Sequence, residues 1–255
     1  MSTESEVLFD VAGTVATITL NRPSQHNAIN AAMRRTFIEA FDRIAADNAI
    51  HVAVIRGAGE RAFSSGADLK EIGDRTPMQR RSVANEEPAA IVRACTKPVI
   101  AAIQGYAFGG GLEIALACDM RIASENAIFC FPEITRGWFP AAGGTQALPR
   151  LVGMGMAMEL ILSGRRFDAE EALRIGLLNA VHKAADFESA VAALADRIGS
   201  HRLGALTLAK AALQMSARAP ADIGFLYEKE LGALSYTLEG RSEALAAFAA
   251  GQGKA

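Results

Sequence analysis

The pattern of hydrophobic and polar positions predicts alternating strands and helices over the first half of the chain. Residues 7–20 are typical of a β-hairpin, because a turn signal at Ala12-Gly13 precedes alternating apolar positions. A helix is predicted from Asn30, where apolar residues recur every three or four positions. Short apolar runs predict buried strands, while 62–68 is predicted as a small-residue loop. The predicted buried strands are 52–55, 98–104, 120–123 and 128–131.

After Thr145 the pattern becomes purely helical. Apolar residues recur every three or four positions over 154–162, 168–175, 190–198 and 203–215. Alternating strands and helices followed by helices alone indicate an α/β core with a helical C-terminal layer. No linker or low-complexity segment separates the two parts. We therefore assign residues 1–190 to the core with the functional site and residues 191–255 to a helical region.

Composition and charge restrict the class of protein. Hydrophobic residues make up 51% and the formal net charge is −2, so nothing indicates binding to nucleic acid or an anionic membrane. No apolar run approaches the roughly 20 residues that span a bilayer. The first six residues (MSTESE) resemble neither a secretory signal nor a transit peptide. Three scattered cysteines are typical of reduced core thiols, so we expect a cytoplasmic protein.

Two glutamates lie in small, apolar surroundings. Glu113 closes the glycine-rich segment 105–113 (GYAFGGGLE), and Glu133 lies in 129–134 (FCFPEI). Burying a carboxylate is costly unless the site uses it. Paired carboxylates in a dry pocket can supply an acid and a base that work near neutral pH. This pair is therefore the leading candidate for catalysis.

Two turns of small residues can present backbone N–H groups. The triple glycine 109–111 leads into a predicted helix, where free amides at the positive end of the helix dipole favour an anion or oxyanion. A bare triple glycine more often marks a tight turn, but Glu113 one helical turn later favours a site. The segment 63–70 (FSSGADLK) also ends at a predicted helix start. A nucleophilic serine there lacks a Gly-x-Ser-x-Gly elbow and an evident histidine partner.

Four aromatic residues lie near Glu133 in the sequence, and they fit core packing and the wall of a pocket equally well. They are Phe129, Phe131, Trp138 and Phe139. The four histidines form no metal-binding pattern, so we expect no metal.

The order of these motifs resembles that of the crotonase (enoyl-CoA hydratase/isomerase) superfamily over nearly the whole chain. The resemblance implies a spiral α/β core of repeated β-β-α turns, with a C-terminal helical region that mediates homotrimers or hexamers. The matching segments are Asn21-Arg22-Pro23 with Asn27-Ala28, 63–70, 97–101, 105–113 with Cys118-Asp119, Pro132-Glu133, Gly143-Gly144-Thr145-Gln146 with Leu148 and Arg150, and 169–177.

The resemblance implies acyl-CoA thioesters as ligands and suggests roles by position. The amides of Ala67 and Gly110 would form an oxyanion hole that binds the thioester oxygen and stabilises an enolate. Arg22 and Lys70 would lie near the CoA phosphates. The bulky, apolar side chains of Trp138 and Phe139 are expected to line the acyl pocket. The expected CoA-lining residues are Ala28, Ala67, Asp68, Leu69, Lys70 and Gly110.

Hydratases of this superfamily resemble the chain in carrying both glutamates. The implied reaction is reversible syn addition of water to a trans-2-enoyl-CoA, giving a 3-hydroxyacyl-CoA. Glu113 would orient and activate the water, and Glu133 would exchange the proton at the α-carbon. No organic cofactor or metal is expected, because amides carry the enolate charge.

Two other functions stay open. An isomerase, or other acyl-CoA enolate chemistry such as carnitinyl-CoA-type dehydration, would need a single carboxylate. A non-catalytic RNA-associated or scaffold protein is disfavoured by the net charge and the glutamate pair. The sequence names no physiological acyl group. The resemblance implies that the loop 73–87 helps to shape the acyl pocket, but its residues indicate no preferred chain length. The sequence also departs from many relatives after Ala247-Phe248, where AAGQGKA replaces a basic segment, so a CoA contact from this tail is in doubt.

Overall fold

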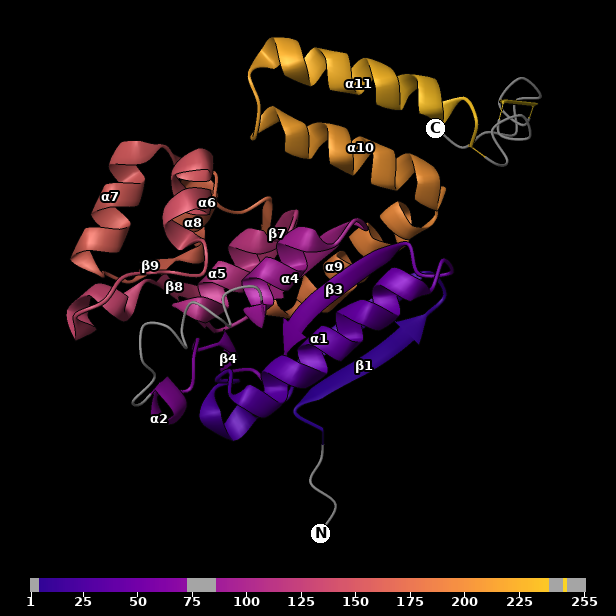
Figure 1. The fold of residues 1–255 in the computed structure, drawn as a ribbon. Coiled ribbons are helices and arrows are strands. Elements are labelled where there is room, and N and C mark those ends of the chain that lie inside the picture. The colour runs from indigo at the N-terminus through magenta and orange to yellow at the C-terminus, as the bar shows by residue number, and fades with distance from the viewer. Residues whose placement is uncertain (1–4, 73–85, 239–244, 247–255) are drawn as a thin grey trace. The chain divides into compact units, whose positions relative to one another are not determined.

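The computed structural model describes residues 5–72, 86–238 and 245–246, and it divides the chain into two compact units (Figure 1). These units are Met1–Ser200 and His201–Ala255. The boundary predicted after residue 190 falls inside helix α9 (Ala184–Gly199), which packs on strands of the first unit through Phe187 and Val191. The observed division therefore follows the end of that helix. Within the described ranges, no helix is long and apolar enough to cross a membrane.

A six-stranded sheet with the order β1-β2-β3-β5-β7-β10 forms the centre of the first unit. The predicted hairpin is its antiparallel edge, and the other strands pair in parallel. The strands are β1 (Val7–Ala12), β2 (Val15–Leu20), β3 (Val52–Gly57), β5 (Val99–Ile103), β7 (Met120–Ser124) and β10 (Ala180–His182).

Both faces of this sheet are covered, which explains why its strands read as continuous apolar runs. Val54 of β3 packs in one cluster with α9, whereas its neighbour Ile55 packs in the main core with Phe37 of α1 (Ala31–Ala46). Successive side chains of a strand point to opposite faces, so a strand buried on both sides has no polar alternation. The predicted start of α1 is confirmed, because Asn30 caps the helix by accepting a 2.7 Å hydrogen bond from the Met33 amide.

Three successive β-β-α units place their first strand in the large sheet and their second in a four-stranded sheet, β4-β6-β8-β9. The predicted spiral of β-β-α turns is thereby confirmed. The small strands are β4 (Ala62–Ser64), β6 (Tyr106–Phe108), β8 (Ile128–Cys130) and β9 (Phe167–Asp168). The helices after these strands are α2 (Leu69–Ile72), α4 (Pro88–Ala94), α5 (Gly110–Ala117), the 3-10 helix η3 (Pro132–Arg136) and α6 (Gly144–Val152).

The prediction of a loop over 62–68 was wrong for β4, and β6 was not predicted. Both strands have three residues, which is too short for an alternating pattern to show. The other helices in the described part of the first unit are the 3-10 helix η1 (Pro23–Gln25), α7 (Met154–Ser163) and α8 (Ala169–Arg174). In the second unit α10 (Leu203–Ser216) packs against α11 (Ala221–Ser235). The predicted role of this region in trimer formation stays a prediction.

Candidate active site

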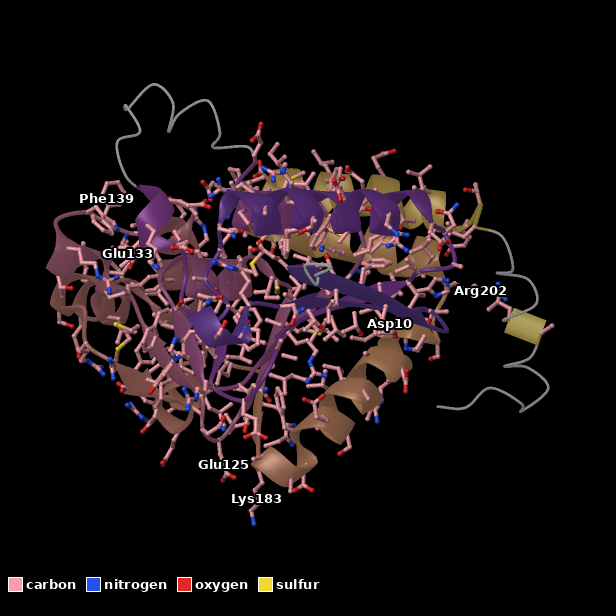
Figure 2. All side chains as sticks on the ribbon, turned by 90° about the horizontal axis from the view of Figure 1, so that it is seen from below. Asp10, Glu125, Glu133, Phe139, Lys183 and Arg202 are labelled. Atoms are coloured by element: carbon pink, nitrogen blue, oxygen red, sulfur yellow. The ribbon has the colours of Figure 1, made fainter. Side chains whose placement is uncertain are left out.

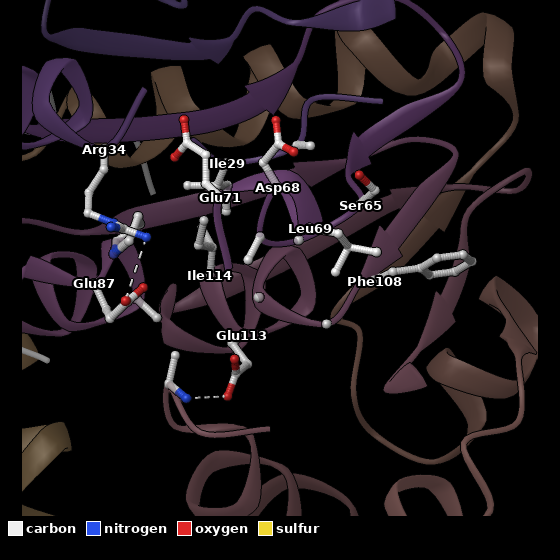
Figure 3. Close-up of a pocket in the computed structure, with 18 of the residues that line it drawn as sticks. Ile29, Arg34, Ser65, Asp68, Leu69, Glu71, Glu87, Phe108, Glu113 and Ile114 are labelled. Atoms are coloured by element: carbon white, nitrogen blue, oxygen red, sulfur yellow. Dashed lines mark hydrogen bonds and ion pairs between the residues drawn. The ribbon is translucent and has the colours of Figure 1, made fainter. Parts of the chain in front are cut away.

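Every site residue proposed from the sequence lines one cavity of about 1590 Å³ (Figure 3). The cavity lies where the loops after β4 and β6 meet the glutamates of α5 and η3. The proposed residues in its lining are Ala28, Ala67, Asp68, Leu69, Lys70, Gly110, Glu113, Glu133, Trp138 and Phe139.

Parallel pairing of β4 with β6 brings the two small-residue loops to the same edge of the small sheet. Their backbones are in close contact at Gly66, where φ is +90°. A Cβ atom on Gly66 would lie 2.8 Å from the Phe108 carbonyl oxygen and 2.9 Å from the Gly110 nitrogen. Glycine is required here for both the positive φ and the missing side chain.

The amides of Ala67 and Gly110 lie close together at this contact. An ideal Cβ on Gly110 would be 3.6 Å from the Ala67 nitrogen. Ile29 fixes the peptide groups around Ala67, since its N–H donates to the Gly66 carbonyl and its carbonyl accepts from the Asp68 amide. The N–H groups of Ala67 and Gly110 have no acceptor among the described residues. Two amide donors in the lining of one cavity, neither with an acceptor among the described residues, meet the requirement for binding an oxyanion.

Glu113 extends from the first turn of α5 and is only 4% exposed. Its Oε1 atom accepts hydrogen bonds from the amides of Ala142 (2.7 Å) and Gly144 (2.8 Å); Figure 3 draws one of these. Burial raises the pKa of this carboxyl, and the two amides partly offset the rise. The carboxylate is thus held in one orientation by the loop that precedes α6.

Glu133 lies in η3 and is 7% exposed. Its Oε1 atom lies against Gly109, where a Cβ would be only 2.7 Å away and φ is +51°. Its Oε2 atom is buried and has no hydrogen-bond partner within the described part of the chain. Burial, together with the nearby Glu113 carboxylate, raises the pKa of Glu133 to about 7. A carboxyl group with that pKa can give or take a proton near neutral pH.

Arg22 lines the cavity and contacts other protein groups, and its predicted place near the CoA phosphates stays a prediction. It donates to the Ala28 carbonyl (2.7 Å) and to Asp68 Oδ2 (2.9 Å), and its Nε lies 3.4 Å from Glu6. The hydrogen bond from Arg22 to the Asp68 carboxylate lowers the pKa of Asp68. Arg22 therefore joins two of the cavity-lining segments, a role that the sequence pattern did not indicate.

The structure separates the four aromatic residues near Glu133 into two pairs. Phe129 and Phe131 are fully buried and belong to the core. Trp138 and Phe139 are 39% and 58% exposed and line the cavity. Figure 2 shows Phe139 at the same end of the molecule as Glu133. Core packing thus accounts for the first pair, and the acyl-pocket role of the second pair stays a prediction.

Six charged residues of the cavity lining were not proposed from the sequence, and they are Glu6, Arg34, Glu71, Glu87, Arg93 and Arg136. Arg34 lies 3.6 Å from Glu87 in an ion pair, drawn in Figure 3, and Arg93 contacts the loop that holds Glu113. No motif in the sequence singles these residues out, because exposed charges are common on helices. The loop 73–87, expected to shape the acyl pocket, lies outside the described residues except for 86 and 87, as does the tail 247–255.

The described residues contain no group of three or more His, Cys, Asp or Glu side chains that could hold a metal ion. The expectation that no metal or organic cofactor is needed stays an expectation. The cavity instead offers backbone amides and two carboxyl groups for polar chemistry.

Comparison with known proteins gives one consistent family. The model of the enoyl-CoA hydratase/isomerase family matches residues 10–250. The chain is 36% identical to a short-chain-enoyl-CoA hydratase of Clostridium acetobutylicum, over 96% of this chain and 94% of that protein. It is 37% identical to a 2,3-dehydroadipyl-CoA hydratase of Escherichia coli, over 96% and 95%.

A crystal structure of an enoyl-CoA hydratase from Bacillus anthracis has the same fold. It superposes with a TM-score of 0.92 at 36% sequence identity, and the match covers 97% of each chain. The predicted fold class, an α/β spiral of the crotonase type, is thereby confirmed. The chain therefore belongs to the enoyl-CoA hydratase/isomerase family, the crotonase superfamily.

Proposed function

We propose that the protein is an enoyl-CoA hydratase, which adds water reversibly and in syn fashion to a trans-2-enoyl-CoA and forms a 3-hydroxyacyl-CoA. The observation that carries this proposal is the buried pair Glu113 and Glu133, which lines the same cavity as the unpaired amides of Ala67 and Gly110. A single carboxyl group would suffice for moving a double bond. Two carboxyl groups can hold and deprotonate a water while protonating carbon.

The amides of Ala67 and Gly110 bind the thioester oxygen in this mechanism. As water attacks the β-carbon, negative charge moves to that oxygen and an enolate forms. Each amide donor typically stabilises such an oxyanion by about 2.7–4 kcal/mol. The charge is carried by backbone groups that are already in place, so we propose that no cofactor is needed.

The two carboxyl groups handle the protons. Glu113, fixed by two amides, accepts a proton from the water as the oxygen bonds to the β-carbon. Glu133, with a pKa of about 7, donates its proton to the α-carbon. One proton thus leaves Glu133 and one arrives on Glu113, and exchange with solvent restores the starting state. Dehydration follows the same steps in reverse.

The CoA part is proposed to lie along Asp68, Leu69 and Lys70, next to Ala28 and the amides of Ala67 and Gly110, with the acyl chain toward Trp138 and Phe139. The names of the relatives in Clostridium acetobutylicum and Escherichia coli, both hydratases of CoA thioesters, support this ligand class.

The helical second unit is proposed to form the homotrimer or hexamer contact. Apolar side chains of α10 and α11 that stay exposed, such as Leu213 and Phe225, support it.

The direct test is to add purified protein to crotonyl-CoA in water and follow the ultraviolet absorbance of the conjugated thioester. A catalytic fall to a plateau, with 3-hydroxybutyryl-CoA as the product, is the expected result. A flat trace with crotonyl-CoA and with longer, branched and aromatic 2-enoyl-CoAs would contradict the hydratase proposal. Conversion of a 3-enoyl-CoA by the same sample would then identify an isomerase.

The pH dependence of kcat/KM should be bell-shaped and the same in both directions. Hydration needs Glu133 protonated and Glu113 ionised, and dehydration needs the reverse. Both directions therefore use the form of the glutamate pair that carries one proton in total. Burial raises the pKa of both groups, that of Glu133 to about 7. Activity should therefore fall above about pH 7 as Glu133 loses its proton, and fall at acid pH as Glu113 gains one.

Initial rates with crotonyl-CoA and with 3-hydroxybutyryl-CoA, measured between about pH 5 and 9, test this dependence. Neighbouring charges shift the two limbs of the pH profile. They are Glu87 and Arg93 beside Glu113, and Arg136 beside Glu133. A hydration rate that keeps rising above pH 7 would exclude Glu133 as the proton donor.

Gly66→Ala is expected to lower kcat/KM by about 10²–10³, the typical effect of losing one oxyanion donor. The added methyl group would lie 2.8 Å from the Phe108 carbonyl and 2.9 Å from the Gly110 nitrogen, so the two loops must separate. Gly155→Ala in α7 is the matched control, because a Cβ there meets no atom within 4 Å. Steady-state kinetics on both variants decide the outcome, and equal activity would remove this contact from the mechanism.

A further inference from the structure

The orientation of Glu113 depends on a loop that has no regular structure of its own. Both hydrogen bonds to its Oε1 atom come from residues 142–144, where the loop runs into Gly144, the first residue of α6. The two donors are the Ala142 and Gly144 amides, which flank the peptide group between Ala142 and Gly143. Whatever fixes that central peptide group also fixes both donors.

Arg93 contacts this central peptide group directly. Its Nη1 atom donates a 2.7 Å hydrogen bond to the Ala142 carbonyl oxygen. A Cβ atom on Gly143 would lie only 2.5 Å from the same Nη1 atom, so the guanidinium lies against the glycine backbone. Gly143 has φ of +124°, a conformation that favours glycine. The glycine therefore allows both the loop conformation and the close approach of Arg93.

The helices behind these residues supply a rigid frame. Arg93 is on α4 and Glu113 on α5, and these two helices pack against each other. Ala89 and Val92 bury one face of α4, which leaves Arg93 exposed at the cavity lining. The loop is thus held between a guanidinium from one helix and a carboxylate from its neighbour.

We propose that Arg93 is a positioning residue for Glu113, acting through the peptide group between Ala142 and Gly143. This inference rests on the proposed function, because it assigns Glu113 to the activation of water. Arg93 does not contact the reacting atoms in this role. It holds the loop that holds the carboxylate, and its positive charge also favours the ionised form of Glu113.

Arg93→Met keeps much of the aliphatic stem and removes every N–H donor. We expect kcat for hydration of crotonyl-CoA to fall by about 10–100-fold, since a shift of about 1 Å in a catalytic group can cost that much. KM should change by less than about twofold, because Arg93 is not expected to bind CoA. Arg93→Lys keeps the positive charge and one nitrogen that can donate hydrogen bonds, so it should recover part of the rate. Arg35→Met, an exposed arginine of α1 outside the cavity lining, is the control.

Two further measurements separate positioning from general destabilisation. Loss of the Arg93 charge should raise the pKa of Glu113 and move the acid limb of kcat/KM to higher pH. Crystal structures of wild type and Arg93→Met should show that residues 142–144 move and that the Ala142 N–H no longer reaches Glu113. Wild-type kcat in the methionine variant, or an unmoved loop, would overturn the inference. If the wild type hydrates no enoyl-CoA, the proposed function fails, and the crystal comparison still decides whether Arg93 holds this loop.

Discussion

Glu133→Gln is expected to lower kcat for crotonyl-CoA hydration by about 10²–10⁴, the usual contribution of a general acid or base. The amide cannot donate an acidic proton to the α-carbon, although it has nearly the same shape. The fold should survive, because Glu133 Oε2 makes no hydrogen bond to any described residue that the change would break. Steady-state kinetics together with a thermal unfolding curve measure both effects.

The stability of this variant carries its own information. A buried carboxyl with an unpaired oxygen costs folding free energy, so its neutral isostere should leave the unfolding temperature unchanged or raise it. Glu39→Gln, an exposed glutamate on α1, controls for the general loss of a negative charge. An active Glu133→Gln enzyme would mean that another group protonates the α-carbon.

Glu113→Gln should cause a loss of similar size, about 10²–10⁴ in kcat, with little change in KM. Its side-chain oxygen can still accept hydrogen bonds from the Ala142 and Gly144 amides, which places the new NH₂ group at the position of Oε2. The loop therefore keeps its contacts, while the base that takes the proton from water is lost. Rates of hydration and binding of a non-reactive saturated acyl-CoA separate the two effects.

The double variant shows whether the carboxyl groups act as one unit. If both carboxyl groups act on the same water and substrate, removing the second group should lower kcat by a much smaller factor than removing the first. A hydratase is expected to lose activity in each single variant. An isomerase needs one carboxyl group, so one single variant would keep nearly full activity on a 3-enoyl-CoA. That result would replace the hydratase proposal with the isomerase.

Features carried by neighbouring residues could be predicted from the sequence. The triple glycine before Glu113, the helix start at Asn30 and the strand over residues 52–55 each have a local signal, and the structure places all three as expected. The motif order also predicted the spiral fold. The meeting of the loops at Gly66 was predicted only as a convergence of amides, without the contact that enforces it.

Features that depend on distant residues could not be predicted in this way. The hydrogen bonds from the loop before α6 to Glu113 join residues 29 and 31 positions apart, and the one from Arg22 to Asp68 joins residues 46 apart. A single sequence contains no signal for such pairs. The same reason explains why the exposure of Trp138 and Phe139 could not be read from the sequence, since exposure depends on the finished packing.

The three β-β-α turns of the spiral divide the proposed chemistry among them. The first contributes the Ala67 amide, the second contributes the Gly110 amide with Glu113, and the third contributes Glu133. A substitution in the third turn can therefore change how protons reach the α-carbon while both oxyanion donors stay in place. Under this proposal, enolate stabilisation and enolate protonation are separable properties, because the two amides come from the first two turns and Glu133 comes from the third.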